Sequence, residues 1–425
     1  MFISSTKTTA SLLCALLSLS LGFSKAASAE YSFNGFANLG VTYSDSEQLA
    51  YRSSLLNNGR EDLSLIPDTL VGLQSNYRFN DKFDAVGQII LQDRDNTSLT
   101  NFVELAFVRF QANRNWAFKI GRFSTNSYLF TDYRYVGHLL NRVRPPLEMY
   151  SAAGSLGNMD GLHASYTMDV DWGAIKFSGA YGQSSFNDTL NGGEVTVDYT
   201  ELSSLNIEFQ STEWRFHMAY LTAVMDNFDS PDLDGIRNLD QLVPAIFVPF
   251  ALELKNNLIP DGKRITYVSV GGQYSFDSFD LIAEYSDYEG EWALAASAKS
   301  GYVSLAYPIK RFTPFITAAF YDRQMQPEII DYANAQAVLP DFAFQQLVAI
   351  SAGANEAIRG GSIDQNSISV GIKWDFSDAW AVKAQVDHFD IGEFGSGFFS
   401  VQEGLLTPAE KLSYNVFSLN FTTTF

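Results

Sequence analysis

The dominant pattern along the chain is a strict alternation of apolar and polar residues with a period of two. In the first such stretch, Phe33, Leu39 and Tyr43 share one face, and Asn34 and Thr42 share the other. Successive side chains of a β-strand point to opposite faces, so this pattern predicts strands with one apolar and one polar face. The same alternation recurs at residues 175–181, 205–209, 214–220, 268–274, 368–376, 380–387 and 417–425.

The connections between these stretches are of two kinds that alternate along the chain. Seven are tight turns, at residues 80–81, 112–115, 169–172, 211–212, 277–278, 309–311 and 377–378. Eight are longer, at residues 44–67, 95–101, 124–160, 183–198, 224–263, 289–298, 325–362 and 391–413. These connections predict sixteen strands with all tight turns at one end and all long loops at the other.

This asymmetry separates two kinds of all-β protein. A soluble β-sandwich also alternates, but it mixes turn lengths at both ends. A barrel in lipid must pair every backbone group internally and leave no free edge, which requires an even strand number and an apolar outer face. Aromatic residues at strand ends, such as Trp374 and Trp380, suit the membrane interface. Residues 30–425 are therefore predicted to form an all-β, transmembrane antiparallel β-barrel of sixteen strands.

The N-terminal segment has the features of an export signal. Lys7 precedes an apolar run from Leu12 to Phe23, and Ala27-Ser28-Ala29 supplies a small-x-small cleavage site. The run of about 12 apolar residues is shorter than the roughly 20 that a spanning helix needs. Residues 1–29 are therefore predicted to be a cleaved signal peptide, and Cys14 leaves with it.

Composition narrows the classes of function. The net charge of −20 argues against a nucleic-acid partner, because phosphate backbones require an excess of Lys and Arg. No nucleophile motif, metal-ligand cluster or Gly-rich phosphate loop occurs in the sequence. We therefore expect no enzymatic activity, no cofactor and no metal site. The acidic run between Asp226 and Asp240 lacks the spacing of a calcium loop and is interpreted as a solvated loop.

Taken together, these features resemble the sixteen-stranded porins of Gram-negative bacteria. The resemblance rests on the signal segment, alternating strands over the whole mature length, a long third loop entered through Gly121-Arg122, and the terminal Phe425. It implies an outer-membrane location and a third loop, residues 124–160, that folds inward and narrows the channel. It also implies a homotrimer, contacts with lipid and lipopolysaccharide, and recognition of Phe425 by the barrel-assembly machinery.

The function predicted from this resemblance is passive diffusion of small hydrophilic solutes and ions through a water-filled barrel. One alternative is a substrate-specific channel for anions or carboxylates. Another is a non-conducting adhesion or receptor barrel. Charges on the predicted lumenal face are mixed, with bases at 78, 109, 119, 176, 215, 373 and 383 and acids at 84, 208, 280, 284 and 387.

The third loop contains the most specific candidates for a constriction. Arg142 and Arg144 directly precede Pro145-Pro146, which stiffens the segment, so both guanidinium groups could act on passing ions. Alternatively, they pair with carboxylates such as Glu148 and fix the loop to the wall. Arg122 falls on the lipid parity of its strand, although a bulge could turn it inward. The predicted constriction residues are Arg109, Lys119, Arg122, Arg134, Arg142, Arg144, Glu148 and Arg215.

Two regions of the sequence depart from the simple pattern. Both faces of residues 102–110 are apolar, so the orientation of this strand is not fixed by parity. Residues 242–254 and 338–358 are unusually apolar for exposed loops. We expect these two loops to pack on each other or into the outer vestibule and reduce its opening, or to contact other subunits or lipopolysaccharide.

Overall fold

The computed structural model describes most of the chain, and all structural statements refer to these residues. The described ranges are 30–55, 57–94, 99–151, 156–190, 193–229, 234–276, 278–292, 297–324, 330–360, 363–393, 395–402 and 410–425. The predicted signal peptide, residues 1–29, lies outside them.

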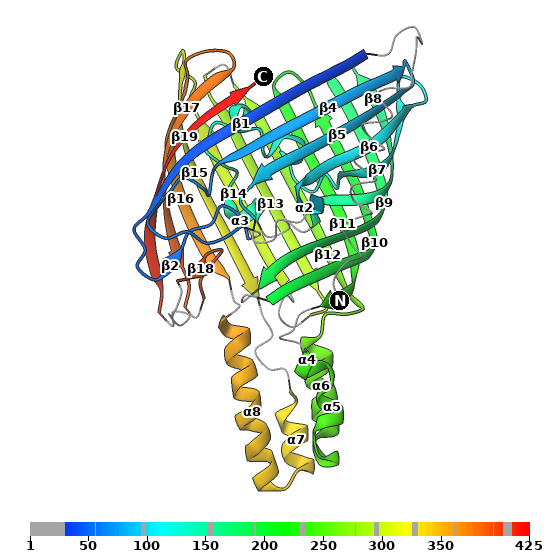
Figure 1. The fold of residues 1–425 in the computed structure, drawn as a ribbon, viewed down its shortest axis with the longest axis vertical. Coiled ribbons are helices and arrows are strands. Elements are labelled where there is room, and N and C mark those ends of the chain that lie inside the picture. The colour runs from blue at the N-terminus through cyan, green and yellow to red at the C-terminus, as the bar shows by residue number, and fades with distance from the viewer. Residues whose placement is uncertain are drawn as a thin grey trace, which may run out of the picture.

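Sixteen antiparallel strands form a closed β-barrel, as the alternation predicted (Figure 1). The barrel closes because β1 pairs with β4 on one side and with β19 on the other. The strands are β1 (Glu30–Ser44), β4 (Leu70–Asn80), β5 (Phe83–Gln92), β6 (Val103–Gln111), β7 (Trp116–Ser124), β8 (Asn158–Val170), β9 (Gly173–Leu190), β10 (Gly193–Gln210), β11 (Trp214–Asp229), β12 (Lys263–Ser275), β13 (Asp280–Gly290), β14 (Ser297–Ala306), β15 (Phe312–Gln324), β16 (Asp364–Asp375), β17 (Trp380–Ile391) and β19 (Leu412–Thr424). Short strands β2 (Leu49–Ala50), β3 (Leu63–Ser64) and β18 (Ser400–Val401) lie in the first and last long loops.

The two faces of each strand differ as the alternation requires. In β10, Leu205 and Ile207 point outward and are exposed, whereas Asn206 points into the lumen and is buried. At the tight-turn end, aromatic rings on neighbouring strands are in contact. The ring centroids of Trp214 and Tyr274 are 3.9 Å apart, and those of Trp380 and Phe421 are 5.0 Å apart. This arrangement is typical of an interfacial aromatic girdle.

The seven predicted tight turns all join consecutive strands, but one predicted long loop is wrong. Residues 183–198 mostly continue the ladder, because β9 and β10 are each 18 residues long and pair from Ala174–Gln210 to Leu190–Gly193. By contrast, β6 and β7 are nine residues each. The barrel wall is therefore tall at β9 and β10 and low at β6 and β7.

The structure shows which side chains of β6 face the lumen, a question that the sequence of residues 102–110 left open. Gln88 of β5 pairs with Leu105 and Ile89 pairs with Val103, so Glu104 is an extra residue in a β-bulge. The bulge turns Glu104 to the lumen, where it is buried, although Leu105 also borders the lumen. Arg109 keeps the lumenal parity and pairs with Asp84 at 3.0 Å.

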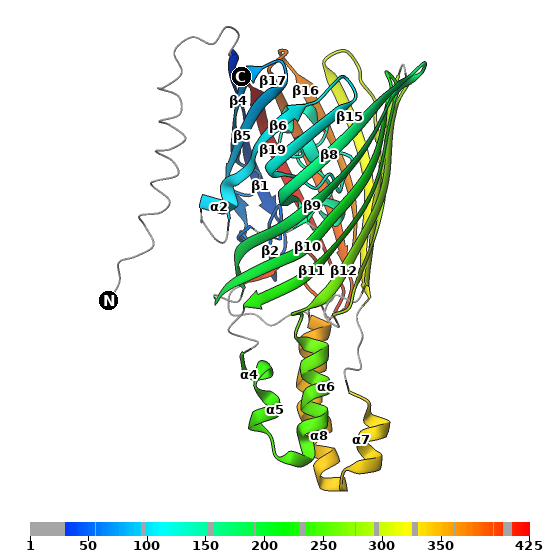
Figure 2. The same ribbon diagram turned by 90° about the vertical axis from the view of Figure 1, so that its right-hand side faces the viewer.

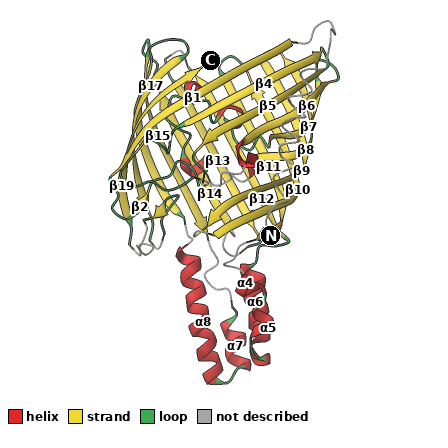
Figure 3. Cartoon of the chain, in the orientation of Figure 1, coloured by secondary structure: helices red, strands yellow, loops and turns green. Residues whose placement is uncertain are grey.

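Helices from two long loops form a projection beyond the barrel rim (Figures 2 and 3). They bury a common apolar core that includes Phe250, Leu254, Leu339, Ala343 and Leu347. The two apolar loops therefore pack on each other and stand outside the barrel rather than inside its mouth. The helical segments of the projection are α4 (Asp234–Arg237), α5 (Leu239–Leu242), η6 (Ala245–Phe247), α6 (Val248–Leu258), α7 (Tyr332–Val338) and α8 (Asp341–Gly360).

The remaining helical segments are short. They are α2 (Leu99–Phe102) in the second long loop, and η2 (Thr131–Tyr133), η3 (Gly137–Leu139) and α3 (Leu147–Tyr150) in the third. Within the described ranges, no helix is both long enough and apolar enough to cross a bilayer.

Candidate functional site

The third long loop, between β7 and β8, crosses the lumen. Its backbone and side chains are bonded to lumen-facing residues on opposite sides of the barrel. Asn206 of β10 and Ser269 of β12 donate hydrogen bonds to the carbonyl oxygens of Thr125 and Ser127, at 3.4 and 2.6 Å. Farther along the loop, the amide of Val143 donates to Gln385 of β17 at 2.8 Å. The loop is therefore attached at both its beginning and its far side.

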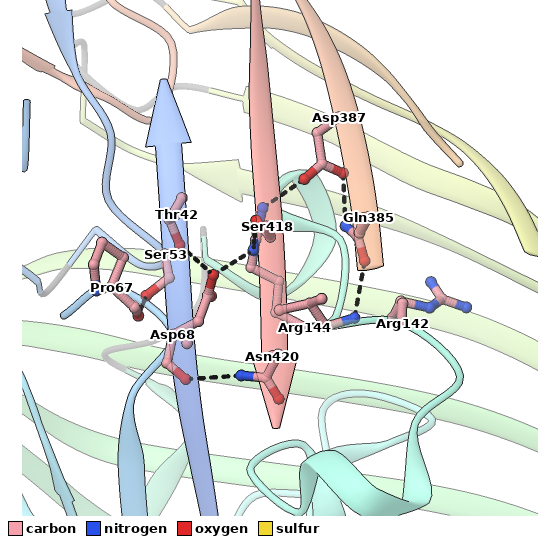
Figure 4. A network of polar contacts seen from close by, with 12 residues as sticks. Thr42, Ser53, Pro67, Asp68, Arg142, Arg144, Gln385, Asp387, Ser418 and Asn420 are labelled. Atoms are coloured by element: carbon pink, nitrogen blue, oxygen red, sulfur yellow. Dashed lines mark hydrogen bonds and ion pairs between the residues drawn. The ribbon is translucent and has the colours of Figure 1, made fainter. Parts of the chain in front are cut away.

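Arg144 is the centre of a polar network that joins the loop to the wall (Figure 4). Its guanidinium group bonds Asp68, just before β4, at 2.7 Å and Asp387 of β17 at 2.5 Å. Burial lowers the pKa of Arg144, but attraction to the two carboxylates outweighs this effect and leaves the pKa above its ordinary value. Asp68 also accepts from Thr42 of β1 at 2.9 Å. Arg144 thus joins the loop to two walls. This is the second alternative given in the sequence analysis, in which the loop arginines pair with carboxylates and fix the loop to the wall.

Two lysines of the wall hold the loop backbone. Lys383 of β17 is 0% exposed, and its ammonium group donates to the carbonyl oxygens of Gly137 and, at 2.7 Å, Arg142. Lys373 of β16 donates to the carbonyl oxygen of His138 at 2.8 Å. Charge-assisted bonds to backbone oxygens are stronger than neutral ones, so these lysines fix the middle of the loop.

Glu284 of β13 has the same role on another wall. Its carboxylate accepts from the amide of Leu129 at 2.7 Å and from the hydroxyl of Tyr150 at 2.5 Å. Around it, apolar loop side chains such as Phe130 and Met149 form one buried cluster with residues of β10 to β15. The loop therefore seals against this side of the barrel.

Arg142 and Glu148 are both buried. The guanidinium carbon of Arg142 lies 5.1 Å from the ring centre of Tyr302, and the residue is only 4% exposed. Glu148 accepts from Gln365 at 2.8 Å. Burial raises the pKa of Glu148, and the Gln365 bond partly offsets this rise. Both residues contribute to loop packing.

The loop tip, residues 131–136, faces the opposite wall. Arg134 pairs with Glu104, the bulge residue of β6, at 2.5 Å, and both side chains are about nine-tenths buried, with exposures of 11% and 10%. Glu104 also accepts from Asn158 at 3.0 Å. Asn38 of β1 donates to the carbonyl oxygen of Tyr135 at 3.5 Å. On its other side, the tip bonds β11 through the hydroxyl of Tyr133 and Arg215.

Three cavities that share lining residues lie along this wall. An outer cavity of about 170 Å³ is bordered by Glu104, Arg134 and Tyr135. A neck of about 20 Å³ shares Glu104 and Tyr135 with it. The neck in turn shares Thr131, Asp132 and Tyr133 with an inner cavity of about 220 Å³ on the tight-turn side.

The other predicted constriction residues lie apart from the neck. Arg109 and Lys119 are neighbours on the lumenal wall below the loop, where the Lys119 ammonium group lies 4.9 Å from the ring centre of Phe107. Arg122 keeps its outward parity, because the register from β6 through β8 has no bulge there. It pairs with Asp160 at 2.6 Å and borders the outer cavity at the low part of the wall.

Several residues of the site were not among the predicted constriction residues. The lumenal position of Glu104 could not be predicted because both faces of β6 are apolar. That of Asp68 could not be predicted because this residue lies at the end of a long loop. Glu284, Lys383 and Asp387 have the predicted lumenal parity, but parity does not reveal which loop atoms they bind. The candidate site therefore contains Arg134 and Arg215, which were predicted from the sequence, together with the wall residues named above, whose contacts with the loop are seen only in the folded chain.

The barrel, its lumenal loop and its outward apolar face define an outer-membrane β-barrel. A model of the Gram-negative porin family matches residues 14–397, and the chain belongs to that family. It is therefore an outer-membrane porin.

Solved structures of similar fold are distant in sequence. The outer-membrane channel DcaP of Acinetobacter baumannii is 13% identical, with a TM-score of 0.53, and 95% of this chain aligns with 99% of that one. The anion-selective porin of Comamonas acidovorans is 10% identical, with a TM-score of 0.51 and coverage of 94% and 100%. A loop-deletion mutant of OmpT of Vibrio cholerae is 11% identical, with a TM-score of 0.52 and coverage of 94% and 100%. No curated protein sequence matches the chain.

Proposed function

We propose that this porin is a passive diffusion channel for small hydrophilic solutes, narrowed where the third-loop tip approaches β1, β5 and β6. The observation that carries this proposal is the presence of three cavities with shared lining residues. Elsewhere the described part of the loop is bonded to the wall through Arg144, Lys383 and Glu284. The water path is therefore assigned to the side of the tip.

The charges along this path favour a weak preference for anions. Below the neck, Arg109 and Lys176 are neutralised by Asp84 and Glu208. Lys119 lies against Phe107, and Arg215 bonds the hydroxyl of Tyr133, whereas the acid Asp132 borders both the neck and the inner cavity. Fixed positive charges in a narrow aqueous pore raise the local concentration of anions.

A channel specific for carboxylates is a second candidate. Arg142 and Arg144 do not support it, because both are buried and Arg144 already binds two carboxylates. Arg134 supports a carboxylate channel, because it borders the outer cavity at the entrance to the neck.

The helical projection favours the other alternative, a receptor barrel, because a pore alone does not require such a projection.

Planar-bilayer recordings of the purified, refolded protein test these proposals. A diffusion channel gives stepwise conductance, and a receptor barrel with a blocked lumen gives none. Reversal potentials in asymmetric KCl measure ion preference. We expect Lys119→Glu to shift the preference toward cations, and Lys310→Glu, in an exposed tight turn, to leave it unchanged. Equal reversal potentials for the wild type and Lys119→Glu would contradict the assigned path.

We also propose that the protein is a homotrimer associated through its low wall. Ser75, Gly87 and Ala106 form one outward-facing row across β4, β5 and β6, and the row continues to Arg122 and Asp160. Charged side chains are unfavourable facing lipid, and small residues allow close contact between proteins. The terminal Phe425, which is exposed, is the proposed signal for the barrel-assembly machinery.

A further inference from the structure

Of the three cavities, the neck has by far the smallest volume. A cavity needs about 10–15 Å³ of this kind of volume to hold one water molecule. The neck has about 20 Å³, roughly a tenth of the inner cavity. Hydrated ions and hydrophilic solutes therefore pass only if one side of the neck moves.

The two sides of the neck differ in how firmly they are held. Its wall consists of β1, β5 and β6, whose backbones are paired in the barrel ladder. Its other side is the loop tip, residues 131–136. The loop is fixed on both sides of the tip, at Leu129 by Glu284 and at Gly137 by Lys383. Between these anchors, the tip is held against the wall of the neck by the Arg134–Glu104 pair and the bond from Asn38 to Tyr135, and on its other side by the bond from Arg215 to Tyr133. The tip is therefore the side of the neck that can move.

The contact between tip and wall has the properties of a latch. The Arg134–Glu104 pair at 2.5 Å spans the gap, and the accompanying bond from Asn38 to Tyr135 is long, at 3.5 Å. Separating a buried ion pair leaves two unpaired charges and is costly. Replacing one partner by a like group costs much less, because the remaining charge stays paired.

A solute carboxylate is such a replacement. Arg134 and Glu104 both border the outer cavity, so an anion entering from outside meets the pair before the neck. When Glu104 releases Arg134, it keeps the hydrogen bond from Asn158 and the attraction of Arg122. The displaced carboxylate is therefore not left without favourable contacts.

We propose that the Arg134–Glu104 pair is a latch that closes the neck, and that a carboxylate solute opens it by exchanging with Glu104 on Arg134. This proposal rests on the path assigned under the proposed function. It makes Arg134 and Glu104 specificity-determining residues, and it makes monocarboxylates the simplest solutes that favour the open state.

Single-channel recording tests the latch through the ratio of open to closed time. We expect Glu104→Gln to raise this ratio about tenfold, which corresponds to a loss of about 1.4 kcal/mol. The exchange Glu104→Arg with Arg134→Glu restores the pair in reverse and should return the ratio toward the wild-type value. The matched control is Glu201→Gln, which removes a carboxylate from an exposed ion pair with Arg264. Heat-modifiable mobility in electrophoresis verifies that each variant is a folded barrel.

Acetate tests the exchange itself. Replacing chloride by acetate at equal concentration should raise the open fraction in the wild type and have no such effect in Arg134→Gln. A wild-type channel that stays open without closures would overturn the latch and leave the diffusion channel intact. Equal open fractions in the wild type and Glu104→Gln, or no response to acetate, would also overturn it. An absence of conductance in every folded variant would instead refute the proposed function and the latch together.

Discussion

Charged side chains in the third loop serve mainly to hold it, and Arg144 shows this most clearly. Its partners Asp68 and Asp387 are each 3% exposed at their side chains. Removing one member of a buried ionic network typically costs about 3–5 kcal/mol, because the remaining charges lose their partner. We therefore expect Arg144→Met to detach the loop from β17 while the barrel itself stays folded.

Limited proteolysis of the refolded barrel measures this detachment as faster cleavage between residues 125 and 157. The triple variant Arg144→Met, Asp68→Asn and Asp387→Asn should recover part of the protection, because no uncompensated charge remains. The control Arg264→Met removes an exposed arginine of the outer surface. Cleavage of Arg144→Met at the wild-type rate would show that the network does not hold the loop.

At the scale of residues, the sequence could predict which side chains lie in the third loop or face the lumen better than it could predict which residues they bind. Arg142 and Arg144 were identified from the stiff Pro-Pro segment, and Asp387 and Glu284 from lumenal parity. Their roles depend on contacts between residues 76 to 243 positions apart, which no local pattern encodes. Glu104 was ambiguous for another reason: a one-residue bulge reverses parity, and neighbouring apolar residues hide the reversal.

At the scale of elements, the helical projection is a single unit made by two loops. The apolar side of α6, with Phe250 and Leu254, is buried in one cluster with Ala335 of α7, Leu347 of α8 and Leu339 between these two helices. Neither loop can bury its apolar residues alone. We expect deletion of residues 234–258 alone to make residues 330–360 sensitive to protease and the protein prone to association in detergent.

Joint deletion of 234–258 and 332–360 should avoid this defect and leave single-channel conductance unchanged, because the projection stands beyond the rim (Figure 2). Size-exclusion chromatography in detergent and bilayer recording measure the two outcomes. A rise in conductance after joint deletion would mean that the projection narrows the entrance.

The elements themselves were largely predictable because lipid imposes a strict pattern on them. Every tight turn and the strand number followed from alternation. The ladder of β9 and β10 continues beyond the point where the alternation ends, so the pattern predicted a loop where the strands still pair. The helices of the projection were seen only as apolar loops, because short helical segments interrupted by Pro244 and Pro340 carry little periodic signal.

At the scale of the whole molecule, the barrel is asymmetric, and its low wall has the surface expected of an interface. At outward positions, Gly87 has no side chain and Ala106 has only a methyl group, and the helix α2 contacts both β5 and β9 across the short strands. On the opposite wall, outward positions such as Val303 and Ile316 are large and suit lipid. A second copy of the chain is therefore expected against the low wall.

Bulky substitutions at the low wall test this arrangement. Gly87→Trp and Ala106→Trp should each convert trimers to monomers in native mass spectrometry, because a Trp side chain prevents the close approach of two walls. Ala283→Trp, at an exposed outward position of β13, is the matched control and should leave the trimer intact. Conductance per barrel should persist in the monomers, because each lumen is built from one chain. If both low-wall variants remain trimeric while Ala283→Trp dissociates, the interface lies at the wall that contains β13.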